Sequence, residues 1–342
     1  MRDQSTNTVD ILHTAIEHLR STYSAAFLGT CEFWTKGLIA FVFISSVFWL
    51  IAQRHNQSRS IRELLRYWFP RELYTHPTAR ITHWHYVLQF ILWGPLLALV
   101  TIDSFKFALG VHGLLETHLG HRAPISSEWA IISVQTSTAI LSLSFAAYWA
   151  HYAAHKIPFL WSFHRSHHSV EALTLPALMR THPVDSLWLG FAAAFSGFVV
   201  GLALYVTGTD KVHPTVIAIL AGYGVFELIT AIFQHAHVPV GFGWLNRIFY
   251  GPVLHQIHHS AEVRHRDKNL GNALRLSIWD WMFGTLYLPE KGEQYRWGLN
   301  DEEYGPSNPH LTLREYYLEP FRHARSVLRK RRHAIPPSGH AS

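Results

Sequence analysis

The chain has 342 residues, of which 49% are hydrophobic and 15% are charged. Soluble domains normally carry about 25% charged residues, so this composition indicates a protein that contacts lipid. The formal net charge is +6, but no nucleic-acid-reading motif accompanies the basic residues, and no nucleic-acid partner is expected. The single cysteine, Cys31, excludes an internal disulfide and a cysteine-based zinc site. A metal would therefore need nitrogen and oxygen ligands.

Five apolar runs follow one another along the chain, and each approaches the length of about 20 helical residues that crosses a bilayer. They cover residues 37–51, 86–102, 129–149, 187–206 and 214–233. The first two are marginal in length, so either could be a tilted span, a half-inserted helix or part of a helical hairpin. The sequence predicts an all-α, integral membrane helical bundle of about four or five spans. Residues 1–36 lack the features of a cleaved signal peptide, and none is expected.

The Lys and Arg residues are distributed unevenly around these runs. A five-span topology places 23 of the 29 on one side, in segments 52–85, 150–186 and everything after Gln234. Loops rich in Lys and Arg face the cytoplasm. We therefore expect this side to be cytoplasmic, in a bacterial inner membrane or the endoplasmic reticulum. The C-terminal tail, with Arg329-Lys330-Arg331-Arg332, is interpreted as a solvated basic end without a catalytic role.

Two copies of one histidine pattern and a third histidine pair are the main chemistry-bearing motifs. They are His164-x-x-His167-His168, His255-x-x-His258-His259 and His151-x-x-x-His155. Spacings of three and four residues place side chains on one face of a helix. Each motif therefore predicts a helical ridge that presents two or three imidazoles in one direction. His235, which follows the fifth run, is a ninth candidate.

Imidazole binds zinc, copper, iron and nickel through a neutral ring nitrogen. One ion takes about four to six donors, so nine imidazoles favour two metal ions. The region between His151 and His265 holds 13 of the 26 histidines, and burying so many rings without a metal would leave ring nitrogens unpaired. Lone histidines elsewhere are interpreted as solvated surface residues, namely His13, His18, His76, His310 and His340.

These motifs belong to a longer series of blocks that resembles the fatty acid hydroxylase and sterol desaturase superfamily. In order, the blocks are Tyr148-Trp149-x-His151-x3-His155, Trp161-x-Phe163-His164-Arg165-x-His167-His168-Ser169, Arg180-x-His182-Pro183, His235-Ala236, His255-x2-His258-His259-Ser260, Asp267-Lys268-Asn269-x-Gly271 and Trp279-Asp280-x2-Phe283-Gly284-Thr285. They cover about residues 140–290. One block alone would be a weak signal, but all of them in order are specific.

The resemblance implies a membrane-embedded centre of two iron ions, with O2 as co-substrate, that attacks an unactivated C–H bond of a lipid. It implies nine iron ligands and no catalytic side chain beyond them: His151, His155, His164, His167, His168, His235, His255, His258 and His259. Hydroxylation and desaturation need the same metals and differ in substrate placement, so both outcomes stay open. The lipid (fatty acyl, sterol, alkylglycerol, sphingoid or carotenoid), the regiochemistry and the oligomeric state stay open as well.

Further polar residues are candidates to orient the ligands or to add to them. His182 is either an outer group or a further ligand, and the outer role is favoured because Pro183 is expected to start a turn. His237 stands where similar proteins more often have Asn, and it either coordinates or donates a hydrogen bond. Ligating imidazoles pass their second nitrogen to a carboxylate or carbonyl, and the nearest candidates are Glu171, Asp185, Asp267, Asn269 and Asp280. Asp280 is expected to anchor the site, with a helix or turn cap as the alternative.

The expected organisation has four parts. They are an N-terminal tail at 1–36, membrane helices with a basic loop at 37–128, a fatty acid hydroxylase-type catalytic domain at 129–289 and a cytoplasmic basic tail at 290–342. Short helices within 250–289 are expected to cap the metal site. A dry cavity beside the metals is expected at the span ends, lined by Phe145, Trp149, Phe191, Phe195, Tyr223 and Phe226.

Reducing power is expected to come from a separate protein, because the chain carries no Gly-rich dinucleotide fingerprint. A b-type cytochrome, or a ferredoxin with its reductase, would dock on the basic face. Two other classes of protein remain alternatives. A histidine-rich metal-ion transporter would place its ligands near the bilayer midplane, often with carboxylates. A zinc-dependent membrane hydrolase needs few ligands, an open water position and a Glu base.

Overall fold

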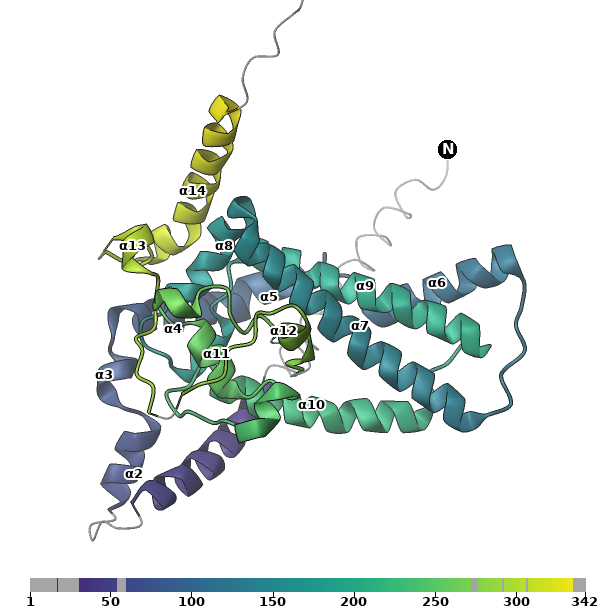
Figure 1. The fold of residues 1–342 in the computed structure, drawn as a ribbon, viewed down its shortest axis with the longest axis horizontal. Coiled ribbons are helices and arrows are strands. Elements are labelled where there is room, and N and C mark those ends of the chain that lie inside the picture. The colour runs from purple at the N-terminus through teal and green to yellow at the C-terminus, as the bar shows by residue number, and fades with distance from the viewer. Residues whose placement is uncertain are drawn as a thin grey trace, which may run out of the picture.

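In the computed structural model, the described residues are Glu17, 31–53, 60–271, 276–290, 292–305 and 307–334. Within them the chain is helical, and its β-structure is limited to two isolated bridges, Phe249 to Leu276 and Ser260 to Trp297. Figure 1 shows a long helical arm joined to a wider cap of short helices and loops. The predicted all-α fold is confirmed. Most of the predicted N-terminal tail and the end of the basic C-terminal tail lie outside the described residues.

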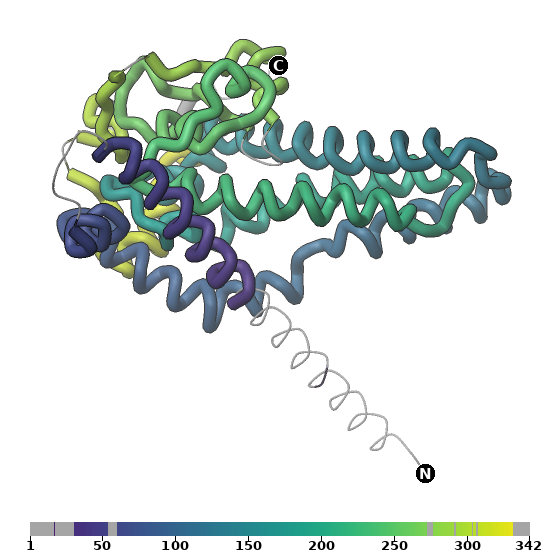
Figure 2. The backbone as a smooth tube through the Cα atoms, turned by 90° about the horizontal axis from the view of Figure 1, so that it is seen from below, coloured from purple at the N-terminus to yellow at the C-terminus, as the bar shows by residue number. Residues whose placement is uncertain are grey.

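Four helices run along the arm (Figure 2): α6 (Ser104–Leu119), α7 (Glu128–Lys156), α9 (Pro183–Thr207) and α10 (Pro214–Gln234). α6 and α9 run from the cap to the far tip, and α7 and α10 return from the tip to the cap. The end of α7, the start of α9 and the end of α10 therefore meet at the cap, although they are far apart in the sequence.

α6 and α9 approach each other closely through two glycines. Gly197 and Gly201 are four residues apart on α9 and so lie on one face of the helix. A Cβ atom at either position would lie 2.6 Å from a backbone carbonyl oxygen of α6, that of Ser104 or that of Ala108. Pairs of small residues at this spacing let membrane helices pack backbone against backbone. The two glycines therefore let the backbones of α6 and α9 pack against each other.

Four helices are long and apolar enough to cross a membrane: Cys31–Ala52, α7, α9 and α10. They contain four of the five predicted apolar runs. Many of their large apolar side chains point outward, such as Phe191 at 60% exposed and Ile217 at 57%, as expected of lipid-facing helices. The helix Cys31–Ala52 lies at the cap end of the molecule (Figure 2), where Phe41 packs on Phe233 of α10 with ring centroids 5.6 Å apart.

The second apolar run, residues 86–102, is not one of these helices. α4 (Pro77–Leu88) passes into a π-helical turn, η1 (Gln89–Trp93), and then into the five-residue α5 (Gly94–Ala98). Pro95 has no N–H to donate to the preceding turn, so it interrupts the helix. Among the described residues, four helices rather than five are long and apolar enough to be candidate spans.

Three helices begin with the same histidine–proline pair. The pairs open α4, α9 and α10 and are His76-Pro77, His182-Pro183 and His213-Pro214. In each, the histidine Nδ1 accepts a hydrogen bond of 3.2 or 3.3 Å from the backbone N–H two residues later, the role that Ser or Asp usually fills. Proline suits the first helical position because the N–H that it lacks would have no partner there. Pro183 thus begins a helix, which corrects the predicted turn.

The cap is built mainly from α8 (Pro158–His168) and α11 (Pro252–His258). Shorter elements complete it: α2 (Ile61–Trp68), α3 (Arg71–Tyr74), η2 (Leu175–Met179), η3 (Gly243–Arg247), η4 (Val263–His265), α12 (Ile278–Met282) and α13 (Asp301–Tyr304). The stretch after residue 290, interpreted as a solvated tail, includes α14 (Leu313–Ala334). α14 packs along α8, with the rings of Phe163 and Phe321 5.1 Å apart.

Candidate metal centre

Nine histidines converge at the cap end of the arm in two adjacent groups. The five-histidine group is His151, His155, His164, His168 and His258, and the four-histidine group is His167, His235, His255 and His259. Within each group, one ring nitrogen from every residue lies within 4.8 Å of the others. The rings of His168 and His259, one from each group, have centroids 4.5 Å apart. The nine residues predicted as ligands are therefore brought together.

Each copy of the duplicated histidine pattern contributes to both groups. On α8, His164 and His168 lie one turn apart and join the five-histidine group, while His167 joins the four-histidine group. α11 reverses this division: it gives His258 to the five-histidine group, and the other two residues of its motif to the four-histidine group. α7 completes the first group, and His235, at the end of α10, completes the second.

Hydrogen bonds at the outer nitrogen, Nδ1, fix the orientation of four rings. The pairs are His151 to the Leu270 carbonyl at 2.7 Å, His164 to the Asp185 carboxylate at 2.9 Å, His167 to the Arg180 carbonyl at 2.9 Å and His258 to the Lys268 carbonyl at 2.8 Å. A carbonyl or carboxylate oxygen only accepts, so each Nδ1 carries the proton. The lone pair on Nε2 is then directed into the group.

The close contacts between Nε2 atoms fit a cation held between the rings. The Nε2 atoms of His151 and His164 lie 3.0 Å apart, and both rings carry their proton on Nδ1. Two lone pairs at this distance repel each other, and a positive ion between them removes the repulsion. The four-histidine group also contains Nε2 atoms separated by 3.0 to 3.4 Å, and there His167 Nδ1 is bonded to an oxygen.

These distances match the spacing of ligands around one metal ion. Metal–imidazole bonds of about 2.1 Å separate neighbouring nitrogens by about 3.0 Å in octahedral and about 3.4 Å in tetrahedral geometry. The Nε2 atoms of His155 and His258 are buried and have no hydrogen-bond partner among the described residues, and buried polar atoms normally have one. A metal ion would supply it. The residues present therefore fit two metal ions with imidazole ligands.

Five rings outside the spanning helices have a lowered pKa and are neutral at physiological pH. Burial lowers the pKa of His167 to about 4 and that of His258 to about 3. For His168, His255 and His259, burial first and neighbouring imidazoles second lower the pKa well below its usual value. Neutral imidazole is the form that binds metal. Burial therefore keeps these side chains ready to ligate.

A short loop at residues 267–271 provides two of the carbonyls that orient the histidines. Asp267 and Asn269 have left-handed φ angles of 56° and 55°, a conformation that Asp and Asn tolerate better than other side chains. Between and after them, the carbonyls of Lys268 and Leu270 each accept a hydrogen bond from a histidine Nδ1. The left-handed residues turn the backbone so that both carbonyls point towards the five-histidine group. This geometry explains why Asp and Asn flank Lys268 in the sequence block.

Asp280 holds this loop rather than a histidine. Its carboxylate accepts hydrogen bonds from the backbone N–H groups of Leu270 at 2.6 Å and Gly271 at 2.8 Å, and from the Thr285 hydroxyl at 2.6 Å. Burial raises the pKa of Asp280 to about 6, although these three donors act in the opposite direction. Asp280 thus acts on the site through the loop backbone.

The other candidate residues have separate places. Asn269 donates to the Leu254 carbonyl at 3.1 Å, which ties the loop to α11. The Asp267 carboxylate lies 3.3 Å from His155 Nδ1 and also pairs with Lys156. It therefore faces the five-histidine group from its outer side.

Three candidates lie outside the two groups. His182 uses Nδ1 to cap α9 and donates from Nε2 to the Tyr317 carbonyl at 3.3 Å. His237 donates from Nε2 to the Tyr67 carbonyl at 2.7 Å, which is the hydrogen-bonding alternative of the sequence analysis. The Glu171 carboxylate accepts from an asparagine side chain at 2.9 Å.

Arg180 has a role that the sequence did not reveal. Besides offering its carbonyl to His167, it is fully buried, and its guanidinium donates to the hydroxyls of Thr82 and Ser169, both at 2.8 Å. The guanidinium carbon also lies 4.9 Å from the ring centroid of Tyr316, a cation–π contact. The residue thus joins α4, α8 and α14 beside the four-histidine group.

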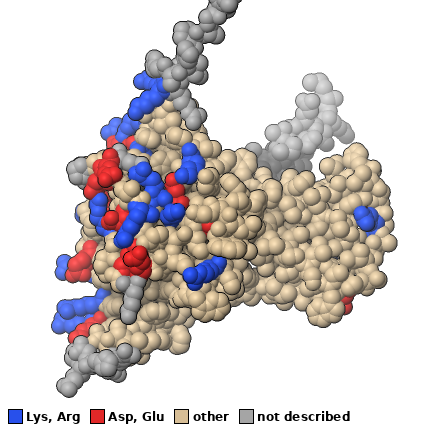
Figure 3. Space-filling view, in the orientation of Figure 1, with Lys and Arg blue, Asp and Glu red and all other residues tan. Residues whose placement is uncertain are grey.

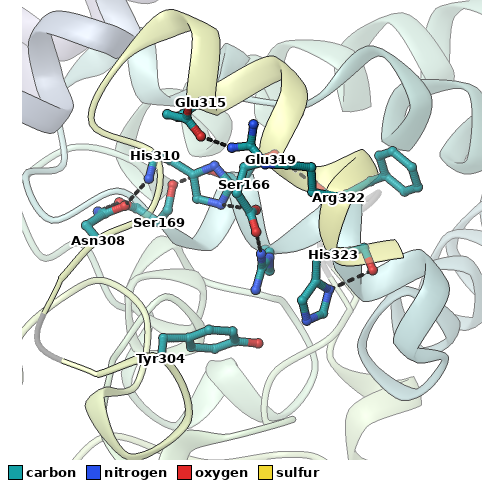
Figure 4. A network of polar contacts seen from close by, with 12 residues as sticks. Ser166, Ser169, Tyr304, Asn308, His310, Glu315, Glu319, Arg322 and His323 are labelled. Carbon is teal, nitrogen blue, oxygen red and sulfur yellow. Dashed lines mark hydrogen bonds and ion pairs between the residues drawn. The ribbon is translucent and has the colours of Figure 1, made fainter. Parts of the chain in front are cut away.

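A second polar network joins α14 to α8 (Figure 4). Arg165, which is 3% exposed, forms an ion pair with Glu319, and Ser162 is 2.9 Å from His323 Nδ1. His310, predicted to be a solvated surface residue, is fully buried there with its Nε2 3.5 Å from Glu319. It is enclosed because the C-terminal segment folds over α8. The network braces the helix that carries three of the clustered histidines.

The predicted dry cavity corresponds in part to an apolar groove between α7 and α9. The groove has a volume of about 320 Å³, and four of the six aromatic residues line it, namely Phe145, Trp149, Phe191 and Phe195. None of the nine clustered histidines lines this groove. Tyr223 and Phe226 lie on α10, outside its lining.

Fold and site together define a helical membrane protein with two adjacent histidine groups at the ends of its spanning helices. The comparisons with known proteins agree. Residues 136–285 match the family model described as fatty acid hydroxylase, so this region of the chain is similar to that family. No solved structure matches the chain.

Three curated relatives illustrate the family. Over 186 residues the chain is 26% identical to ornithine lipid hydroxylase OlsE of Rhizobium tropici, covering 54% of this chain and 52% of the relative. Over 165 residues it is 30% identical to alkylglycerol monooxygenase of Homo sapiens, covering 48% and 32%. Over 168 residues it is 29% identical to fatty acid hydroxylase vlmA of Lecanicillium sp, covering 46% and 43%. The matches thus span about half or less of each relative.

Proposed function

We propose that this chain is a membrane-bound oxidoreductase that holds two iron ions and uses O2 with external electrons to hydroxylate or desaturate an unactivated C–H bond of a lipid. The names of its relatives support oxidation of a lipid as the shared chemistry, because they describe an ornithine lipid hydroxylase, an alkylglycerol monooxygenase and a fatty acid hydroxylase. Since the matches cover only part of each relative, the substrate of this chain is part of the proposal.

The main support for this proposal is the short distance between Nε2 atoms of different histidines. His151 and His164 both commit their Nδ1 proton to an oxygen, yet their Nε2 atoms lie 3.0 Å apart. The four-histidine group beside it also brings Nε2 atoms to within 3.0 and 3.1 Å of each other. Nine imidazoles exceed the needs of one ion, and iron is among the metals that imidazole suits. Bound iron would supply the activation of O2 that oxidation of an unactivated C–H bond requires.

The residues of the chain contribute orientation and exclusion of water. The Asp185 carboxylate and the three backbone carbonyls hold the protons of four rings on Nδ1, which fixes each tautomer. Asp280 keeps two of these carbonyls in place through the loop at 267–271. Eight of the nine rings belong to residues that are buried, so most of their surface is shielded from bulk water. Hydroxylation consumes O2, two electrons and two protons and yields an alcohol and water.

The electrons would come from a separate protein on the cap side of the membrane. Figure 3 shows Lys and Arg gathered over the cap, while the visible face of the arm carries almost none. Together with the 23 of 29 basic residues that the sequence pattern assigns to one side of the membrane, this distribution supports a cytoplasmic cap. A b-type cytochrome or a ferredoxin with an acidic surface would dock there. Turnover reconstituted with such a donor should fall as salt rises.

The decisive experiment is metal analysis and Mössbauer spectroscopy of the full chain, purified without oxygen, followed by turnover in ¹⁸O2 with a candidate donor. We expect about two coupled irons per chain and a lipid product that carries ¹⁸O or a new double bond. Stoichiometric zinc without iron would contradict the proposal and favour the hydrolase. Iron-loaded protein that oxidises no lipid would contradict it as well.

A further inference from the structure

A cavity of about 340 Å³ opens onto only one of the two histidine groups. His155, His168 and His258 line it, and all three belong to the five-histidine group. No member of the four-histidine group is part of the lining. A molecule that enters this cavity therefore meets the five-histidine group, and the reacting part of a substrate must fit here.

Part of the cavity lining besides the histidines is polar. Glu262, Arg266, Asp267 and Asn300 line it. Asp267 is paired with Lys156, and the Asn300 side chain is hydrogen-bonded to the protein backbone. The half-buried Glu262 carboxylate differs from them, because within the described part of the chain it has no hydrogen bond or ion pair. Glu262 is thus a cavity-lining acceptor that has no partner among the described residues.

An alkyl chain is a poor occupant of such a cavity. Filling it with methylene groups would strip water from the Glu262 carboxylate and give nothing in return, and burying an unpaired charge is costly. The volume of about 340 Å³ also lies near the lower end of the range for ligand sites, about 300 to 1,000 Å³. It suits a headgroup and its adjoining carbons better than a whole lipid.

We propose that this cavity holds the polar headgroup of the lipid substrate, that the headgroup donates a hydrogen bond from O–H or N–H to Glu262, and that the oxidised carbon lies in or beside the headgroup. The inference rests on the proposed function and specifies its substrate class. The C–H bond that breaks there is replaced by C–O in hydroxylation, and the second oxygen atom of O2 leaves as water with the protons and electrons from the external donor.

The hydrocarbon tail has an apolar route away from the cavity. Pro158 and Trp161 line the cavity where α7 passes into α8. Ile157 and Phe159, on either side of this proline, are 40% and 38% exposed. They place an apolar surface next to the cavity at the end of a candidate spanning helix. A lipid could therefore keep its tail in the bilayer while its headgroup reaches the histidines.

The first test measures binding without turnover. The full chain loaded with zinc, which imidazole binds but which is redox-inert, is titrated with 1-O-octylglycerol and with its dimethyl ether, which lacks both O–H donors. We expect octylglycerol to bind about tenfold more tightly, because a hydrogen bond to a charged acceptor is worth this much or more. Equal binding of the two probes to the native protein would overturn the inference, and this comparison needs no variant.

Matched variants then identify the acceptor. Glu262→Ala should weaken octylglycerol binding about tenfold, and Glu262→Gln, which keeps an oxygen acceptor, should lie between. Glu302→Ala removes an exposed carboxylate of α13 that does not line the cavity, and it should bind like the native protein. Native-like affinity in Glu262→Ala would overturn the assignment. Metal content and the unfolding temperature show that each variant is folded.

Product mapping separates this inference from the proposed function. The iron-loaded chain is supplied with octylglycerol and an electron donor, and the oxygenated carbon is located by mass spectrometry. Oxygen on the glycerol or on the first carbon of the chain supports the inference, whereas oxygen in the middle or at the end of the chain overturns it and leaves the proposed function intact. Absence of any oxidation would contradict the proposed function, and the binding comparison would still decide the headgroup inference.

Discussion

The orientation of each clustered histidine ring depends on what its outer nitrogen contacts, and this allows a matched comparison of two histidines. His258 directs Nε2 into the five-histidine group, whereas His182 caps α9. His258→Asn should lower metal affinity at that group by more than about 100-fold, since loss of an outer hydrogen bond alone costs 10- to 100-fold. His182→Asn should keep native metal content, because Asn is an effective N-cap.

Metal content per chain, measured after identical purification, checks this prediction. Native metal content in His258→Asn would contradict the ligand assignment. Metal loss of equal size in the two variants would instead indicate that His182 acts on the metal site.

At the residue scale, the sequence revealed which rings would share a helix face but not what holds them. The spacings within the three motifs predicted which rings lie on one helix face, because helix periodicity determines this. The acceptors of His151, His167 and His258 are backbone carbonyls, which every residue carries, so no residue type marks them. The capping role of His182 did have a signal, the histidine–proline pair that also opens two other helices.

At the scale of elements, the contact between α6 and α9 depends on side-chain size at two positions. Gly201→Val would place side-chain atoms against the Ala108 carbonyl and Val111, which a Cβ would already approach to 2.6 and 2.7 Å. We expect destabilisation by roughly 1–3 kcal/mol, the usual cost of overpacking. Gly190→Val, on the same helix with nothing within 4 Å of its Cβ position, should cost much less.

The unfolding temperature of both glycine variants, measured in one detergent, checks this prediction. Equal stability of the two variants would show that close packing at Gly201 is not required.

The contact between α14 and α8 depends on a nearly buried ion pair. Glu319→Gln would leave the Arg165 guanidinium, 3% exposed, without its charged partner, and such changes cost about 3–5 kcal/mol. Glu315→Gln breaks a pair with Arg322, which is 53% exposed, and exposed pairs contribute about 0–1 kcal/mol.

Denaturant unfolding of the two glutamate variants measures the difference. If Glu319→Gln is no less stable than Glu315→Gln, α14 does not brace α8 through this pair.

The sequence predicted most long helices but missed two local events. Hydropathy placed a run across 86–102, whereas Gly94-Pro95 follows a π-turn and interrupts the helix. Hydropathy averages over many residues, so a single missing N–H hardly changes it. The charge of the C-terminal segment hid α14, although its buried positions Tyr316, Pro320 and Ala324 recur every four residues, which is a helical signal.

At the scale of the whole molecule, buried neutral histidines make stability depend on pH. In the unfolded chain histidine takes up a proton near pH 6.5, whereas in the folded protein the pKa is about 4 for His167 and about 3 for His258. Between the folded and unfolded pKa values, the unfolded state binds more protons. The free energy of unfolding is therefore highest above pH 6.5 and decreases as the pH falls towards 4. Asp280, with its pKa raised to about 6, opposes this trend in part.

The unfolding temperature and bound metal of the solubilised protein, followed from pH 8 to pH 4, test this dependence. Both should fall together, because protonated imidazole releases metal. A constant or rising unfolding temperature would contradict the prediction.

The orientation in the membrane can be tested with introduced cysteines, because Cys31 is the single natural one. In a Cys31→Ser background, Glu302→Cys places a thiol on the cap and Glu128→Cys places one at the far tip of the arm. An impermeant maleimide added to intact cells should label only the tip position, since the basic cap is expected to face the cytoplasm. Labelling of the cap position alone would reverse this orientation.

The loop at residues 267–271 has a consequence for how this site changes during evolution. Its working groups are the carbonyl oxygens of Lys268 and Leu270, and no exchange of side chains at these two positions deletes them. An alanine scan would pass over both without a signal. Substitution is instead restricted at Asp267 and Asn269, because few other residues accept their left-handed backbone conformation. Asp267 and Asn269 can thus be harder to replace than Lys268 and Leu270, although it is the carbonyls of Lys268 and Leu270 that orient the histidines.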